Sequence, residues 1–151
     1  MKFVKIKDVH SPERWHSNDS GIDFFIPNDF KLQLRQKQRV TIPLGIKIKL
    51  EEWVDLQFVD KSWLASKLGL TILWWLIDNW YRGELAVVVY NTSEDIISLK
   101  GWMKIVQGVI RPVFTPEPLE VTEDELENTD RWEWWFGSTG LLSKEDEWNK
   151  V

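Results

Sequence analysis

Asp78 and Tyr81 lie three residues apart, next to a glycine turn at Gly83 and just before an apolar run that begins at Leu85. A carboxylate within hydrogen-bond reach of a water can act as a general base, and an aromatic ring can pack against a cyclic ligand. Taken alone, the pair is better explained by an acid that caps a turn and a tyrosine that packs on a sheet. The meaning of the pair therefore depends on which other segments accompany it.

Four further segments accompany the pair in a fixed order: Ser-Gly-Ile-Asp at 20–23, Asp-Lys-Ser-Trp-Leu-Ala at 60–65, Lys-Ile-Val-Gln-Gly at 104–108, and an aromatic and glycine-containing segment at 131–140. With residues 77–85, these segments resemble the five ordered motifs of the trimeric dUTPase family. The resemblance covers about residues 12–140, and five matches in order are far more specific than any one of them.

This resemblance implies an all-β fold, a jelly-roll β-sandwich that assembles as a homotrimer. Each active site would lie at a subunit boundary, with the C-terminal arm of one chain reaching a neighbour. The implied reaction converts dUTP and water to dUMP and pyrophosphate, with Mg²⁺ bound to the phosphate oxygens. The implied partners are thus dUTP, dUMP and two further copies of the chain.

The resemblance also implies roles for single residues. Asp78 matches the general base, and Gln107 matches a glutamine that contacts phosphate and water. Asp23 matches an acid that holds Mg²⁺ through water, while Tyr81 matches the tyrosine that leaves no room for a 2′-hydroxyl group. Each role has a simpler structural explanation in a turn, a sheet face or a strand edge, and it is the ordered set of motifs that favours the site.

Lys61 and Ser62 stand where the family has Arg-Ser at the start of a helix, a position that suits phosphate oxygens. Lysine provides a point charge but lacks the planar fork of arginine, so we expect looser phosphate geometry here. Arg131 and Phe136 match arm residues that pair with the terminal phosphate and stack on the uracil. The remaining residues that the resemblance assigns to substrate binding are Trp63, Leu76, Ile77, Lys104, Gly137, Ser138 and Thr139.

The hydrophobic pattern independently predicts an all-β chain. Residues 46–50 alternate Ile and Leu with Lys, and residues 54–59, 85–90 and 105–110 are short runs rich in Val, Ile or Leu between turn residues. A single helical turn or two is predicted for residues 62–68, with Ser62 as N-cap and Gly69 as the stop.

Charge divides the 151-residue chain into a β domain, 1–114, and an acidic arm, 115–151. The first part has a formal charge of +3 and the second of −8. We expect residues 115–130 to be extended rather than part of a core. The small positive charge of the domain suits a small anion, and the pattern does not favour binding to nucleic acid.

Cysteine is absent and there are two histidines, His10 and His16, which match no motif and are expected to be exposed. A thiol nucleophile, a disulfide framework and a Cys or His metal site are therefore disfavoured. The N-terminus lacks the apolar core of a signal peptide, and no apolar run reaches the ~18 residues of a membrane span. We expect a cytoplasmic protein that does not bind membranes.

Tryptophan is unusually frequent, with 11 residues against 8 glycines. Glycine suits positions with positive φ or close backbone approach, and an indole does not. One hypothesis is that UGA codons that encode glycine are written here as tryptophan. Eight of the tryptophans stand where the family has glycine: Trp53, Trp63, Trp75, Trp80, Trp102, Trp132, Trp134 and Trp135.

Other functions stay open at the level of sequence. A catalytically impaired protein with the dUTPase fold could serve as a nucleotide-sensing or protein-binding module. A dCTP deaminase is disfavoured by the segments around Tyr81 and Phe136, and a carbohydrate-binding tryptophan surface is disfavoured because the tryptophans do not follow one strand face. The residue that reads the uracil edge is unassigned, since the hairpin before Asp78 is about two residues shorter than in many relatives.

Overall fold

The described residues of the computed structural model are 1–74 and 76–126, and they form an all-β chain with two short helices. The strands assemble into four small sheets, and every pairing within them is antiparallel. The largest sheet has four strands in the order β2 (Gly21–Phe25), β11 (Lys104–Pro112), β6 (Val54–Val59) and β8 (Leu76–Ile77). Five of the residues that the sequence singled out lie on this sheet: Asp23, Leu76, Ile77, Lys104 and Gln107.

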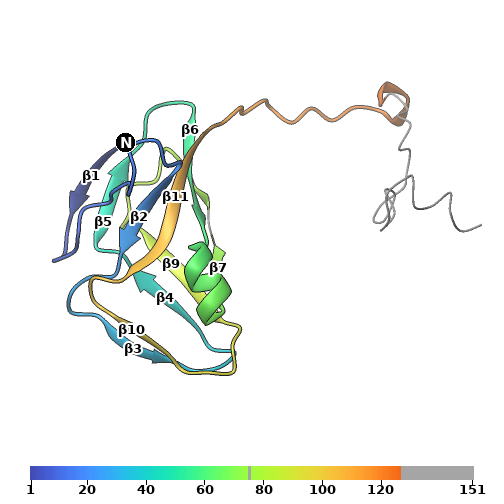
Figure 1. Cartoon of the computed structure of the whole chain (residues 1–151). Helices are drawn as coiled ribbons and strands as arrows, with labels where there is room; N and C mark the ends of the chain where they lie inside the picture. Colours follow the sequence, from blue (N-terminus) through green and yellow to red (C-terminus); the bar gives the residue numbers. More distant parts are fainter. Residues whose placement is uncertain (75, 127–151) are drawn as a thin grey trace, which may run out of the picture. The chain divides into compact units, whose positions relative to one another are not determined.

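The other three sheets complete the domain. A three-stranded sheet has the order β4 (Arg39–Pro43), β9 (Ala86–Asn91), β7 (Leu70–Trp74). Two further pairs are β1 (Lys2–Lys5) with β5 (Ile46–Lys49), and β3 (Lys31–Leu34) with β10 (Ile97–Lys100). These two pairs lie at well-separated edges of the strand assembly (Figure 1).

Alternating hydrophobicity explains the strands that the sequence predicted. In β5, Ile46 and Ile48 are buried while Lys47 and Lys49 are exposed. β9 buries Val87, Val89 and Asn91 in the same alternating way. The predicted runs at 54–59, 85–90 and 105–110 correspond to β6, β9 and β11, so these predictions are confirmed to within a residue or two at most ends.

The core lies between the sheets and is built from aliphatic residues around two phenylalanines. The rings of Phe24 and Phe58 meet edge to face with their centroids 5.3 Å apart. Gly108 on β11 allows this packing, because a Cβ there would lie 2.7 Å from Leu56 Cδ1 and 2.8 Å from Phe24 Cε2. A side chain at position 108 would therefore push β11 away from the core.

The predicted helix forms, but its N-terminus differs from the prediction. Residues 62–68 are helical, and the segment Leu64–Leu68, η1, has π-type hydrogen bonding. Trp63 is the N-cap and no side chain caps the helix, so the prediction that Ser62 is the N-cap was wrong. The predicted stop is confirmed, since Gly69 ends the helix with φ 65°.

The chain divides into two units, Met1–Thr115 and Pro116–Val151. In the described part of the second unit, residues 116–126, the chain is exposed and contains one short 3₁₀ turn, η2 (Glu123–Glu125). Thr122 begins this turn and forms a capping box with Glu125. Among the described residues, no helix has the length and apolar character needed to cross a membrane.

Two tryptophans occupy backbone conformations that favour glycine. Trp53 has φ 66° and Trp102 has φ 68°. Both are positions at which the sequence resemblance predicts glycine, and L-residues with a bulky side chain rarely adopt this region. Trp63, at another such position, instead has an ordinary helical φ of −67°. The conformational argument for glycine therefore holds at Trp53 and Trp102 but not at Trp63.

Candidate active site

Three adjacent strands bring Asp23, Gln107 and Lys61 together. In the register of the four-stranded sheet, Gln107 on β11 lies between Asp23 on β2 and Val59 on β6. Lys61 follows two residues after Val59, where the chain leaves β6. Residues more than eighty positions apart in the sequence thus meet at one place on the sheet.

The carboxylate of Asp23 is buried and both of its oxygens are engaged. Oδ1 lies 2.6 Å from Lys61 Nζ and accepts a hydrogen bond from Gln107 Nε2 at 3.2 Å. Oδ2 lies 2.8 Å from Lys104 Nζ. A buried carboxylate of this kind is stable only when it is paired and hydrogen-bonded, and here two cations do the pairing. We call Asp23, Lys61, Lys104 and Gln107 the Asp23 cluster.

Lys104 is held from several sides. Besides Asp23, its ammonium group lies 3.4 Å from Glu13 Oε1 and 4.7 Å from the ring centroid of Trp15. Backbone hydrogen bonds between Glu13 and Asp23 fix the loop that carries Glu13 beside β2. The contacts made by Lys104 are therefore within the protein, and its predicted contact with substrate stays a prediction.

The ion pairs shift the pKa values of both partners. Burial by itself raises the pKa of Asp23, but the hydrogen bonds from Lys104 and Lys61, with the charge of Lys61, outweigh it and leave the pKa below its usual range. The hydrogen bond to Asp23 raises the pKa of Lys104, against a smaller opposing effect of burial. Asp23 and Lys104 are therefore both charged at neutral pH.

Gly21 makes room for the side chain of Gln107. A Cβ at position 21 would lie 3.0 Å from Gln107 Cδ and 3.1 Å from its Oε1. With no side chain at Gly21, the amide of Gln107 can lie across β2 and reach Asp23. The glycine that precedes Asp23 in the sequence motif thus has a packing reason.

Ser62 and Trp63 extend the cluster toward solvent. Both are exposed at the beginning of the helical segment that follows Lys61. The ammonium group of Lys61 is the charged group of this segment, and its side chain is 19% exposed. This end of the sheet therefore presents a cation and a hydroxyl group together, an arrangement suited to an anion.

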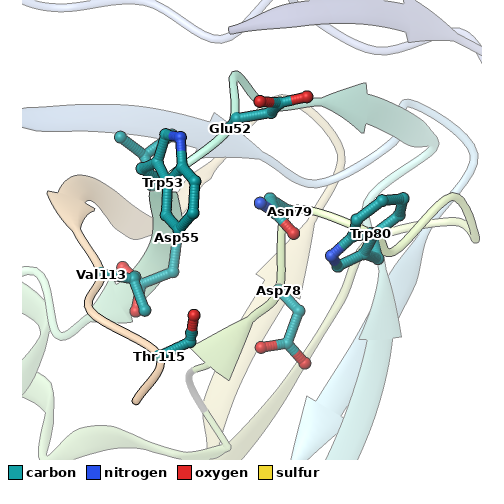
Figure 2. A pocket seen from close by; sticks show the side chains of 9 residues that line it. Glu52, Trp53, Asp55, Asp78, Asn79, Trp80, Val113 and Thr115 are labelled. Carbon is teal, nitrogen blue, oxygen red and sulfur yellow. The ribbon is translucent and has the colours of Figure 1, made fainter. Parts of the chain in front are cut away.

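The second group of predicted residues lies around Asp78, just after β8. A pocket of about 510 Å³ opens here, lined by Asp78, Asn79, Trp80, Trp53, Asp55, Thr115 and neighbours. Figure 2 shows Trp53 and Trp80 on either side of the Asp78–Asn79 segment, with the carboxylate of Asp78 directed away from both indoles. Of the other predicted binding residues in this segment, Leu76 is exposed and Ile77 is buried.

Tyr81 folds back over its own turn. Its hydroxyl group donates a hydrogen bond to the carbonyl oxygen of Glu84 at 2.9 Å. The ring packs against Gly83, where a Cβ would collide with it. One face of the ring is thereby fixed, and 39% of the residue is exposed. The glycine turn that the sequence pointed to holds the ring in this position.

Within one chain the two groups of residues are far apart. Gln107 on β11 pairs with Val59 on β6, and Ile77 on β8 pairs with Leu56 on β6. Val59 and Leu56 are three residues apart along β6. Strands rise by ~3.3 Å per residue and neighbouring strands are ~4.8 Å apart, so three residues along and two strands across correspond to roughly 14 Å. The backbone of Gln107 is therefore well separated from that of Ile77, and from Asp78 which follows it, within one chain.

The described residues do not offer a direct ligand set for Mg²⁺. Among residues 1–74 and 76–126, no three His, Cys, Asp or Glu side chains gather closely enough to hold a metal ion. Asp23, the predicted outer ligand, has an ammonium group on each oxygen. Two adjacent positive charges repel a divalent cation, so the Asp23 cluster does not fit this role.

Several predicted residues lie outside the described part of the chain. These are Arg131, Phe136, Gly137, Ser138 and Thr139, together with the glycine-position tryptophans Trp75, Trp132, Trp134 and Trp135.

Sequence reasoning did not find Glu13, Trp15 or Asp55. Glu13 and Trp15 lie in a segment without periodicity, and only the tertiary structure places them on Lys104. Asp55 did leave a signal, since it is a charged residue inside the apolar run of β6. It pairs with Arg111 at 3.2 Å, and its buried Oδ1 accepts no hydrogen bond from the described residues.

Comparison with known proteins identifies relatives along the whole domain. The sequence model of the dUTPase family matches residues 7–140. Deoxyuridine 5′-triphosphate nucleotidohydrolase from Alkaliphilus metalliredigens is 37% identical over 147 residues, which are 93% of this chain and 99% of the relative. The enzyme of the same name from Gloeothece citriformis is 38% identical over 146 residues, 95% of this chain and 98% of the relative.

Solved structures agree in fold. The dUTPase of Staphylococcus bacteriophage 80alpha with dUpNHpp has a TM-score of 0.82 at 24% identity, covering 93% of this chain and 98% of the phage chain. The dUTPase from phage phi11 of S. aureus, described with a structural Mg(II) ion, has a TM-score of 0.73 at 22% identity, covering 81% and 96%. With the family match and the bacterial relatives, the order of the motifs and the positions of Asp23, Lys61, Asp78 and Gln107 lead to one conclusion: the chain belongs to the dUTPase family.

Proposed function

We propose that this chain hydrolyses dUTP to dUMP and pyrophosphate. The oxygen of a water molecule attacks the α-phosphorus, the bond from this phosphorus to the oxygen that bridges to the β-phosphate breaks, and pyrophosphate leaves with that oxygen. Membership of the family and relatives named for this reaction support the proposal. A catalytically impaired module is not favoured by these relatives.

In this proposal Asp78 is the general base. Its carboxylate is exposed beside a pocket, so a water and a substrate can both approach it. The proton of the attacking water passes to this carboxylate as the new phosphorus–oxygen bond forms. Tyr81, held over Gly83, presents the free face of its ring to the deoxyribose.

The phosphates bind at the Asp23 cluster. Lys61 supplies the positive charge, Ser62 a hydroxyl donor, and Gln107 an amide that contacts phosphate and the attacking water. Arg131, Phe136, Gly137, Ser138 and Thr139 would complete the site from the arm. The arm contacts and a cytoplasmic location both stay predictions.

The observation that carries the proposal is the division of the site into two halves on one sheet. Asp78 and Gln107 must reach the same water, yet roughly 14 Å separates their positions within a chain. Two copies of the chain, packed so that the Asp78 end of one meets the Asp23 cluster of the other, satisfy both requirements. A jelly-roll homotrimer with sites at its subunit boundaries is the assembly that we propose.

Mg²⁺ would be held by the triphosphate rather than by the described residues of the chain. When bound, it would neutralise part of the phosphate charge and so make pyrophosphate a better leaving group. Lys61 and Ser62 then recognise the remaining phosphate oxygens. No protein residue needs to be a direct ligand for this arrangement.

We also propose that the natural protein has glycine at the family positions where this sequence has tryptophan. Positive φ at Trp53 and Trp102 supports it, because the backbone there has the conformation of glycine. Trp53 and Trp80 also border the Asp78 pocket, where smaller residues would leave more room for a nucleotide. UGG codons at Trp132, Trp134 and Trp135 in the source gene would exclude mistranslation as the explanation.

The activity is tested by pyrophosphate release from dUTP with Mg²⁺. The chain as written is compared with one that has glycine at Trp63, Trp75, Trp80, Trp102, Trp132, Trp134 and Trp135. Activity in either chain supports dUTP hydrolysis, and activity only in the glycine chain also supports mistranslation. If both chains fold as trimers and neither releases pyrophosphate, the catalytically impaired module becomes the better explanation.

Asp78→Asn tests the base within whichever chain is active. An amide cannot take the proton, so kcat should fall by ~10² or more while the affinity for a non-hydrolysable dUTP analogue stays within about threefold. Steady-state kinetics and calorimetric titration measure the two quantities. A variant that keeps its kcat would exclude Asp78 as the base.

A further inference from the structure

Asp23 is placed where it can control the geometry of a flexible cation. Lys61 stands where the family has arginine, and lysine carries its charge on four freely rotating carbons. In this chain the ammonium group of Lys61 lies 2.6 Å from the buried Oδ1 of Asp23. Gln107 also donates to the same oxygen, and the backbone pairing with Glu13 fixes the strand beneath it. The carboxylate is thus a rigid anchor for Lys61.

The anchor leaves Lys61 able to bind an anion. An ammonium group has three N–H donors, and Asp23 is the one partner of Lys61 Nζ among the described residues. Two donors are therefore available to a phosphate. The anchored cation is held in advance of substrate, which reduces the entropy lost on binding.

Lys104 keeps Asp23 from fully neutralising the charge of Lys61. A single carboxylate would neutralise Lys61, but the second oxygen of Asp23 is paired with Lys104 at 2.8 Å. Asp23, Lys61 and Lys104 together carry a net charge of +1. Glu13 pairs with Lys104 at 3.4 Å and formally balances that charge, but its side chain is 53% exposed, so solvent screens it more than the buried Asp23.

We propose that Asp23 is a positioning residue that anchors Lys61 for phosphate binding, balanced by Lys104, and that it does not hold Mg²⁺ in this chain. Three of the roughly four acceptor positions of this carboxylate are taken, and two of the three partners are ammonium groups that repel a metal ion. This inference rests on the proposed function, because it assumes that Lys61 meets the phosphates of dUTP.

Metal-free binding separates the two roles. The probe is α,β-imido-dUTP in the presence of EDTA, titrated calorimetrically into wild type, Asp23→Asn, Lys61→Ala and the double variant. If Asp23 anchors Lys61, each single variant binds about tenfold more weakly and the double variant binds no more weakly than Lys61→Ala. Asp29→Asn, which removes an exposed acid, is the control for the loss of one negative charge.

Magnesium dependence gives the second measurement. The Mg²⁺ concentration for half-maximal activity should change by less than about twofold in Asp23→Asn, because the metal is not held there. A further variant, Lys61→Arg with Asp23→Asn, should recover part of the lost affinity, since the planar guanidinium needs less anchoring.

The opposite results overturn the inference. Unchanged metal-free affinity in Asp23→Asn, with a tenfold or greater rise in the Mg²⁺ requirement, would make Asp23 a metal ligand. Thermal unfolding of each variant shows whether a loss of affinity comes from misfolding. If Asp23→Asn misfolds, Lys61→Ala and the double variant Lys61→Arg with Asp23→Asn decide the question. If wild type binds the analogue but releases no pyrophosphate from dUTP, the proposed function fails, while the binding measurements still test the anchor.

Discussion

Asp23 unites two cations on one buried carboxylate, and this pairing makes the fold sensitive to pH at both extremes. The lowered pKa of Asp23 means that the cluster stabilises the folded state above about pH 4 and loses this contribution as pH falls through the folded pKa. The raised pKa of Lys104 acts in the other direction. Its contribution is present below about pH 10 and is lost as pH rises through the folded pKa.

Asp23→Asn should therefore destabilise the protein in a pH-dependent way. Near pH 7 we expect the free energy of unfolding to fall by about 2 kcal/mol, because the amide leaves Lys61 without a charged partner and Lys104 with Glu13 alone. The difference from wild type should shrink as pH falls below about 4, because Asp23 then takes up a proton in the unfolded chain, and in the folded protein only at lower pH. Urea unfolding at fixed protein concentration over pH 3–8 measures this, and a difference that is the same at pH 3 as at pH 7 would contradict it.

At the scale of elements, two turns combine a tryptophan side chain with a backbone conformation that favours glycine. Trp53 precedes β6 and Trp102 precedes β11, and both have positive φ. Trp102 regains some stabilisation by packing on His10, with ring centroids 4.2 Å apart, whereas Trp53 is 68% exposed. The strain at Trp53 is therefore the less compensated of the two.

Trp53→Gly should stabilise the fold by about 1 kcal/mol, since positive φ costs a non-glycine residue on the order of 1–3 kcal/mol. Trp63→Gly is the matched control, because it also replaces an exposed tryptophan at a family glycine position but starts from helical φ. That change should destabilise by about 0.5–1 kcal/mol. Thermal or denaturant unfolding compares the two, and shifts in the same direction would show that φ is not the cause.

At the scale of the whole molecule, the proposed site takes residues from more than one chain. Lys61→Ala removes the phosphate cation from one half of the site, and Asp78→Asn removes the base from the other. Each variant alone should be nearly inactive. If a site takes its two halves from different copies, trimers refolded from an equal mixture contain some sites with both halves intact.

A site is intact only when one copy supplies Lys61 and the neighbouring copy supplies Asp78, and each condition has an even chance in an equal mixture. The refolded mixture should therefore recover about a quarter of wild-type activity. Pyrophosphate release from the mixture, beside each variant refolded alone, measures the recovery. Activity no higher than the mean of the two separate variants would place each complete site within a single chain and contradict the composite arrangement.

The order of the motifs and the alternation of apolar residues were enough to predict the family, the all-β class and the strands β5, β6, β9 and β11. These features are local, and a run of alternating residues carries its own evidence of one buried face. Strands β3 and β10 were not predicted, although β10 alternates buried and exposed residues as β5 does. Their pairing partners lie about 65 residues away, as in Ser98 with Gln33.

Tertiary structure alone decided how the site residues are grouped. The register of β2, β11 and β6 brings Asp23, Gln107 and Lys61 together and leaves Asp78 at the other end of the same sheet. It also placed Lys104 and Glu13 against Asp23, which changed the role that we assign to this carboxylate. The identity of a motif residue follows from its local pattern, but its partners and its charge environment depend on strands that are distant in the sequence and meet only in the folded protein.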